Sequence, residues 1–173
     1  WFSVKVNSGK KDLKGKLINS IVVNNNVLSD GELVADTTNL REWFPIGNED
    51  YAFEGEFDGN GQQIKGLYYN RPEFSYAGLF GHTLNSAKIY DITLSYSYIR
   101  ANEYVAGIVG AASNTKITNC INNSVIYGSS SVGGVVGSAA NNSVSITYCK
   151  NRNTIYGKHH VGGIVGNNYA DIS

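Results

Sequence analysis

The sequence predicts an all-β fold in which the chain winds into a parallel β-helix. The 20 glycines, 12 tyrosines and only 2 prolines in 173 residues suit short strands joined by tight turns. A glycine-containing pentapeptide also recurs at spacings of 29, 27 and 29 residues, and a second motif keeps step with it. A fixed period of this kind indicates a repeat architecture. Hydrophobic residues make up 42% of the chain, which is enough for one core, so we expect a single domain.

Two motifs define the repeating unit. The pentapeptides are AGLFG at 77–81, AGIVG at 106–110, GGVVG at 133–137 and GGIVG at 162–166. The second motif is IYDI at 89–92, ITNC at 117–120 and ITYC at 146–149. From Cys120 and Cys149 onward the last two units align without a gap. Two independent motifs in step indicate a true repeat.

Each unit has the length of one coil of a β-helix. Its apolar runs are short and rich in Val, Ile and Tyr, which is typical of strands, and a unit of 27–29 residues holds about three of them. A propeller blade would need about 40 residues, and a leucine-rich repeat would need its Leu/Asn signature. Stacked coils place equivalent side chains over one another at about 4.8 Å. We therefore expect Asn122 and Asn151 to form a hydrogen-bonded ladder, and the paired glycines to allow close backbone approach.

Residues 42–70 predict further strands upstream of the repeats. Phe53, Gly55 and Phe57 share one face of an alternating segment and Glu54 and Glu56 share the other, as in a half-buried strand. The Asp-Gly-Asn-Gly run at 58–61 then predicts a tight turn.

These motifs together carry a family resemblance. The run WFPIG at 43–47, the pattern F-x-G-x-F-D-G-x-G-x-x-I-x-G-L at 53–67 and the repeated GG[IV]VG units resemble the GLUG-repeat region of bacterial cell-surface and secreted proteins. The match covers roughly residues 42–166, and similar regions occur in streptococcal immunoglobulin A proteases, outside their catalytic part, and in large surface proteins of gut bacteria. The resemblance implies a right-handed parallel β-helix in an extracellular setting and no activity of its own.

The beginning of the chain is expected to cap the helix. Residues 1–9 resemble the stretch that precedes such β-helices, where a short capping helix is expected, although the alternation of Phe2, Val4 and Val6 also suits a strand. The basic residues in and after this stretch are expected to join the cap: Lys5, Lys10, Lys11, Lys14 and Lys16. We divide the single domain into 1–41 (cap and first strands), 42–75 (leading coils) and 76–173 (repeats), and expect it to be a fragment of a larger protein with flanking domains.

Composition argues against several function classes. Fourteen Lys and Arg against fourteen Asp and Glu leave no net charge, so the electrostatic attraction on which nucleic-acid binders depend is missing. The apolar runs are far shorter than the ~20 residues of a membrane-spanning helix. We therefore expect neither a nucleic-acid partner nor a membrane-spanning segment.

The acidic residues suggest one enzymatic alternative. Residues 76–173 contain only three carboxylates, Asp91, Glu103 and Asp171, too few for a recurring acid/base pair. The acidic residues concentrate earlier, at Glu49, Asp50, Glu54, Glu56 and Asp58. A solvated strand face and turn is the favoured interpretation of that segment. A polysaccharide-degrading lyase or hydrolase would require these carboxylates to converge in a groove.

No metal or cofactor is predicted. The run at 58–61 fails the calcium-loop pattern, which needs Gly at the sixth position and Glu at the twelfth, where this chain has Gln63 and Tyr69. His159 and His160 lack accompanying ligands. Cys120 and Cys149 are expected to stack inside as free buried thiols, because the coil spacing exceeds the ~3.8 Å between Cβ atoms of a disulfide.

The remaining candidate site lies on the outer face. If Ile126 and Ile155 point inward, Tyr127 and Tyr156 point outward as a stack, with Ile99 as their equivalent one coil earlier. Such an apolar strip suits sugar rings or another protein. The alternative is that these tyrosines only pack on each other.

The sequence therefore favours a non-catalytic module on the surface of a bacterium or secreted from it. It would act as an adhesin-like domain that binds a glycan or a host or cell-surface protein, or as a structural spacer. The alternative is the polysaccharide-degrading β-helix enzyme.

Overall fold

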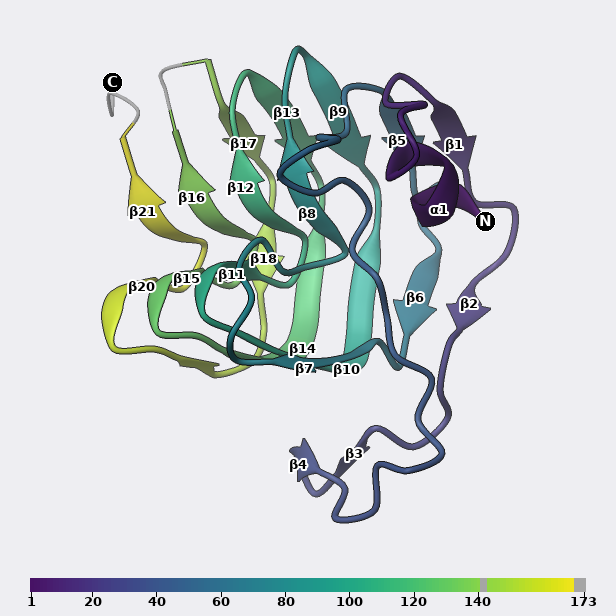
Figure 1. The fold of residues 1–173 in the computed structure, drawn as a ribbon, viewed down its shortest axis with the longest axis vertical. Coiled ribbons are helices and arrows are strands. Elements are labelled where there is room, and N and C mark those ends of the chain that lie inside the picture. The colour runs from purple at the N-terminus through teal and green to yellow at the C-terminus, as the bar shows by residue number, and fades with distance from the viewer. Residues whose placement is uncertain (141–142, 170–173) are drawn as a thin grey trace.

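The computed structural model describes residues 1–140 and 143–169, which form a parallel β-solenoid of about four turns. Figure 1 shows the coils side by side, from the N-terminal end to the C-terminal end. The predicted fold class is confirmed. Each complete coil passes through four sheets, where about three strands were expected, because the strand that begins within the pentapeptide forms a sheet of its own.

Four parallel sheets run along the solenoid. The first contains β1 (Lys14–Lys16), β5 (Glu56–Asp58), β9 (Ala87–Tyr90), β13 (Thr115–Thr118) and β17 (Ser145–Thr147). The second contains β2 (Ile21–Val22), β6 (Gln63–Lys65), β10 (Thr93–Ala101), β14 (Ile121–Tyr127) and β18 (Lys150–Asn151), with β7 (Tyr68–Arg71) on β10 and β19 (Ile155–Tyr156) on β14. The third contains β11 (Glu103–Ala106), β15 (Ser130–Gly133) and β20 (His159–Gly162). The fourth contains β8 (Phe80–Thr83), β12 (Val109–Ala112), β16 (Val136–Ala139) and β21 (Val165–Asn168).

The strand register reproduces the sequence repeat. In the fourth sheet Phe80 pairs with Val109, Val109 with Val136 and Val136 with Val165, at the predicted spacings of 29, 27 and 29 residues. Stacking of like residues buries this column: Phe80, Val109 and Val136 have no exposed surface. The interior is therefore a set of aligned apolar ladders, which pack in the same way from coil to coil.

The predicted asparagine ladder is confirmed. Asn122 is fully buried, and its side-chain Nδ2 donates to Oδ1 of Asn151 at 2.9 Å. The glycines beside it allow the close approach that was expected: a Cβ on Gly107 would collide with the Asn122 amide, and a Cβ on Gly134 would lie 2.5 Å from Cγ of Asn151. Pentapeptide glycines thus leave room for the inward-facing amides.

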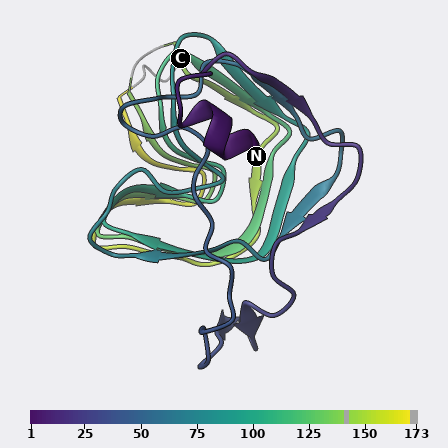
Figure 2. The same ribbon diagram turned by 45° about the vertical axis from the view of Figure 1, so that its right-hand side comes forward.

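A short capping helix, α1 (Phe2–Val6), closes the N-terminal end. Figure 2 shows it lying across the end of the coils. Val6 is fully buried, and the Phe2 ring packs on Phe53 and Phe57 with ring centroids 5.9 and 5.5 Å apart. The helix therefore covers the apolar interior and the strand interpretation of residues 2–6 is wrong.

Two lysines that follow the capping helix form ion pairs with carboxylates of the next coil. Lys11 pairs with Glu54 at 2.6 Å and Lys16 pairs with Asp58 at 2.9 Å. An antiparallel hairpin of β3 (Leu28–Ser29) and β4 (Glu32–Leu33) projects from the solenoid (Figure 1).

Candidate functional site

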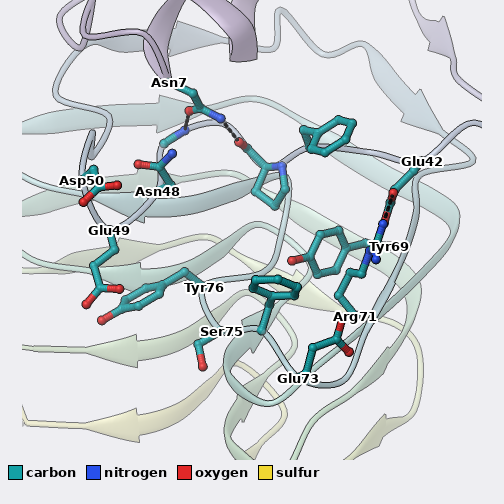
Figure 3. A pocket seen from close by; sticks show the side chains of 14 residues that line it. Asn7, Glu42, Asn48, Glu49, Asp50, Tyr69, Arg71, Glu73, Ser75 and Tyr76 are labelled. Carbon is teal, nitrogen blue, oxygen red and sulfur yellow. Dashed lines mark hydrogen bonds and ion pairs between the residues drawn. The ribbon is translucent and has the colours of Figure 1, made fainter.

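A groove of 680 Å³ lies where residues 42–50 run past β7 and the turn that leads to residue 76. Its size falls within the range of about 300–1,000 Å³ that is common for small-ligand sites. Figure 3 shows Glu49 and Asp50 on one side of it and Arg71 and Glu73 on the other, with Tyr76 between them. The groove thus brings together two segments that lie on either side of β5 and β6 in the chain.

The cap positions one wall of the groove. The side chain of Asn7, directly after α1, donates from Nδ2 to the carbonyl of Pro45 at 3.0 Å. Its Oδ1 accepts the backbone N–H of Gly47 at 2.8 Å. Gly47 has φ +76° and its Cβ position lies 2.7 Å from the backbone nitrogen of Phe53, so only glycine fits this turn. The path of residues 45–47 is therefore fixed by the hydrogen bonds of Asn7 and by the close approach of Phe53 to Gly47.

A bidentate ion pair holds the opposite wall. The guanidinium of Arg71 donates from Nε to Oε1 of Glu42 at 2.6 Å and from Nη2 to Oε2 at 2.8 Å. This fork geometry satisfies both carboxylate oxygens. The hydrogen bonds from Arg71 lower the pKa of Glu42, so its carboxylate is ionised and already bound at neutral pH.

Four aromatic side chains line the groove. Phe44 and Phe74 are 64% and 56% exposed, so much of each ring is open to a ligand in the groove. Tyr69 is almost buried, and the ring of Tyr76 packs between those of Tyr104 and His82 at centroid distances of 5.0 and 5.2 Å. Two exposed rings therefore stand beside two tyrosines that are held in place.

The two tyrosine hydroxyls stay protonated at neutral pH. Burial raises the pKa of both Tyr69 and Tyr76, and a nearby carboxylate adds to the effect, from Glu42 in the first case and from Glu49 in the second. A phenol in this state can both donate and accept hydrogen bonds. The groove therefore offers apolar faces together with hydroxyl and carboxylate groups.

The acidic segment does not converge as a unit. Glu49 and Asp50 line the groove. Glu54 pairs with Lys11, Asp58 pairs with Lys16, and Glu56 accepts the hydroxyl of Tyr90 at 2.6 Å; these three are the strand-face residues that were expected. The predicted solvated strand face therefore holds for part of the segment, and two carboxylates remain for a ligand.

The predicted tyrosine stack is present, but Ile99 does not belong to it. The rings of Tyr127 and Tyr156 lie 4.3 Å apart at an interplanar angle of 7°. Ile99 pairs with Ile126 and is fully buried, and Arg100 occupies the position next to Tyr127. A register shift between Ser95 and Tyr98 shortens the coil offset by one residue, and a shift of one residue moves a side chain to the other face.

The stack exposes less surface than expected. The ring of Tyr127 is half-buried and packs on Tyr98, which is 6% exposed. Tyr98 lies in a small apolar cluster with Val27 and Val125, against which Leu28 and Leu33 of the hairpin pack. Only Tyr156, 41% exposed, offers an open face.

His159, His160 and the two cysteines lie apart from the groove lining, whereas His82 packs on the groove residue Tyr76. His159 pairs with Ser130, as the alignment predicted, and is exposed. Within the part of the chain that the structure describes, no three His, Cys, Asp or Glu side chains gather as a metal site. Cys120 and Cys149 are free thiols, as expected, but only Cys120 is fully buried.

The aromatic lining of the groove was not predicted from the sequence. A signal was available, because Phe44 and Phe74 each stand within two residues of one of the two prolines, Pro45 and Pro72. Proline interrupts a strand, so an aromatic residue beside it escapes the alternating pattern that would bury it. No sequence pattern links residues 42–50 to the turn that leads to residue 76. The two segments meet only because the chain coils back on itself.

Comparisons with known proteins give two partial relatives. Halomucin of Haloquadratum walsbyi is 32% identical over 103 residues, which is 58% of this chain and 1% of that protein. A putative Gly-rich membrane protein of Evansella cellulosilytica is 38% identical over 69 residues, which is 40% of this chain and 8% of that protein. The chain thus spans a small part of each relative. No family model matches the chain, and no solved structure matches it.

The name of the second relative describes that protein as a membrane protein. In residues 1–140 and 143–169, no helix has both the length and the apolar character needed to span a bilayer.

Proposed function

We propose that this solenoid is a non-catalytic recognition domain of a bacterial cell-surface or secreted protein and that it binds a glycan in the groove. The observation that carries the proposal is the pairing of two exposed phenylalanines, Phe44 and Phe74, with polar groups in a hollow of 680 Å³. Sugar rings present an apolar face and a rim of hydroxyls. Aromatic rings cover such a face, while tyrosine hydroxyls and carboxylates bond the rim.

Several carboxylates near the groove are already engaged, so a catalytic role would depend on Glu49, Asp50 and Glu73. A glycosidase needs one carboxyl group that is kept protonated and a second that is free to act as base or nucleophile. Glu42 has a lowered pKa and is engaged by Arg71, and Glu54, Glu56 and Asp58 are engaged elsewhere. The two relatives' names are compatible with a surface setting, and the resemblance to GLUG-repeat regions agrees with it.

The experiment is a glycan array with the purified chain, with release of reducing ends monitored in the same wells. The test variant is Phe44→Ala with Phe74→Ala, which removes the two exposed rings. We expect its affinity for any bound glycan to fall at least about tenfold, the equivalent of roughly 1.4 kcal/mol. Both side chains are more than half exposed, so the fold should be unaffected.

The tyrosine stack supplies the matched control. Tyr127→Ser with Tyr156→Ser also removes two aromatic rings, but outside the groove. Loss of binding in this variant alone would move the site to the stack that the sequence suggested. Release of sugar ends would favour the polysaccharide-degrading enzyme, and absence of both binding and release, with host and cell-surface proteins also negative, would favour a spacer.

A further inference from the structure

Two cysteines occupy equivalent positions in consecutive coils. Cys120 lies directly before β14 and Cys149 directly before β18, and the backbone N–H of Lys150 donates to the carbonyl of Cys120 at 2.9 Å. Two residues before the cysteines, Thr118 pairs with Thr147 in register. Because the strands are in register before and after them, the two cysteines are stacked neighbours at the coil spacing of about 4.8 Å.

Both thiols have the same orientation. The Sγ of Cys120 donates to the carbonyl of Thr118 at 3.3 Å, and the Sγ of Cys149 donates to that of Thr147 at 3.4 Å. Each sulfur also approaches a carbonyl oxygen of the preceding coil, at 3.7 and 3.8 Å respectively. The two side chains therefore point in the same direction, one above the other.

Their accessibility differs. Cys120 is fully buried, whereas Cys149 is half-buried because no described strand covers the far edge of the last coil. Interaction with the Cys120 thiol lowers the pKa of Cys149, while the same interaction and burial raise the pKa of Cys120. Cys149 is thus the thiol that a reagent reaches first, and its interaction with Cys120 favours its thiolate form.

We propose that Cys120 and Cys149 form a dithiol modification site that reacts with small-molecule disulfides and closes into a disulfide bond between coils. The thiolate of Cys149 attacks one sulfur of the reagent, forms a mixed disulfide and releases one reagent thiolate. Cys120 then attacks the Cys149 sulfur, and the second reagent thiolate leaves and takes up the Cys120 proton, so that it departs as a thiol. The two protein thiols are oxidised by two electrons and the small disulfide is reduced to two thiols.

The geometry permits closure with a small movement. A spacing of about 4.8 Å lies within the 4.4–6.8 Å range of Cα distances in disulfides, and the Cβ atoms must approach by about 1 Å. The last coil can supply this movement, because among the described residues it is held by a neighbouring coil on one side only. The new bond would link β14 to β18 and close a loop of one full coil.

The test uses oxidised glutathione with the folded chain, followed by intact mass spectrometry under non-reducing conditions. The wild type is expected to lose two hydrogen atoms, to retain no glutathione and to release two glutathione thiols. Cys120→Ala should retain one glutathione on Cys149, and Cys149→Ala should not react. Circular dichroism checks that each variant is folded.

Thermal unfolding gives a second readout. Oxidised wild type should unfold at a higher temperature than the reduced protein, and reductant should reverse the difference. A stable glutathione adduct on the wild type, an unreacted wild type or a dimer linked through cysteines would each overturn the proposal. If a variant fails to fold, a peptide map of the oxidised wild type decides alone, because only an intramolecular Cys120–Cys149 link agrees with it.

Discussion

Replacement of Gly134 by alanine tests whether contacts between coils make the pentapeptide glycines necessary. An ideal Cβ at this position would collide with the carbonyl oxygen of Gly163 in the next coil and would lie 2.5 and 2.6 Å from Cγ and Cβ of Asn151. Gly163 is the equivalent residue one coil later, and a Cβ there meets nothing within 4 Å. Gly163→Ala is therefore a control with the same motif position and chemistry but without the neighbour.

The expected magnitudes follow from these contacts. Overpacking a core costs about 1–3 kcal/mol, and the upper end applies at Gly134 because a backbone carbonyl and a hydrogen-bonded asparagine oppose the new methyl group. At about 2.1 cal/mol/K of unfolding entropy per residue, a loss of about 3 kcal/mol in 173 residues lowers Tm by about 8 °C. Gly163→Ala should remain within about 1 kcal/mol of the wild type or gain slightly, because alanine restricts the unfolded chain.

Thermal and urea unfolding followed by circular dichroism measure both free energies of unfolding. The wild type should be clearly more stable than Gly134→Ala and nearly equal to Gly163→Ala. Equal losses in the two variants would refute the reasoning, because they would trace the requirement for glycine to the local backbone conformation rather than to the coil that stacks above it.

Two further predictions concern the cap and pH. Phe2→Ala removes the ring that packs on two buried phenylalanines and should cost about 2 kcal/mol, whereas Val4→Ala, 66% exposed on the same helix, should cost almost nothing in urea unfolding. Burial lowers the pKa of His82 below its ordinary 6.5, and its Nδ1 has no hydrogen-bond partner among the described residues. The unfolded chain therefore takes up the proton first, so stability is lost as pH falls below about 6.5 toward the folded-state pKa. His82→Gln should lack this pH-dependent component, and the same loss in both proteins would contradict the assignment.

Much of the solenoid could be predicted from the repeat alone. Equivalent residues stack, so the alignment of Ile89, Ile117 and Ile146 in sequence became their pairing in the first sheet. The ladder between Asn122 and Asn151 followed in the same way. These predictions succeed because, in a parallel solenoid, sequence spacing and spatial neighbourhood are the same information.

The misassignment of Ile99 shows where that logic fails. Thr93 pairs with Ile121, an offset of 28 residues, but Tyr98 pairs with Val125, an offset of 27. An ungapped alignment at 28 places Ile99 on Tyr127 and turns a core residue outward. The irregularity lies at a corner where no motif marks it, and a single residue is enough to change the face.

The groove could not be predicted from the sequence, for a different reason. Its walls come from residues 42–50 and from the turn after β7, neither of which belongs to the repeat. Their approach depends on the hydrogen bonds of Asn7 and on the pairing of Glu42 with Arg71. Such contacts between distant segments leave no period in the sequence.

The contrast between the regular coils and the irregular groove has a physical basis. It bears on where related solenoids should bind their ligands. Coils that repeat in register produce straight, shallow faces, because each side chain lies over its equivalent. The groove lies where that regularity is broken, and residues 42–50 supply the break: they join the sheets only through isolated bridges at Glu42 and Ile46. Changes in such a segment alter the groove without disturbing the ladders beneath, since the ladders are fixed by the repeats. The repeats therefore act as a rigid support, and ligand specificity is expected to vary with the leading coil and the turn that faces it.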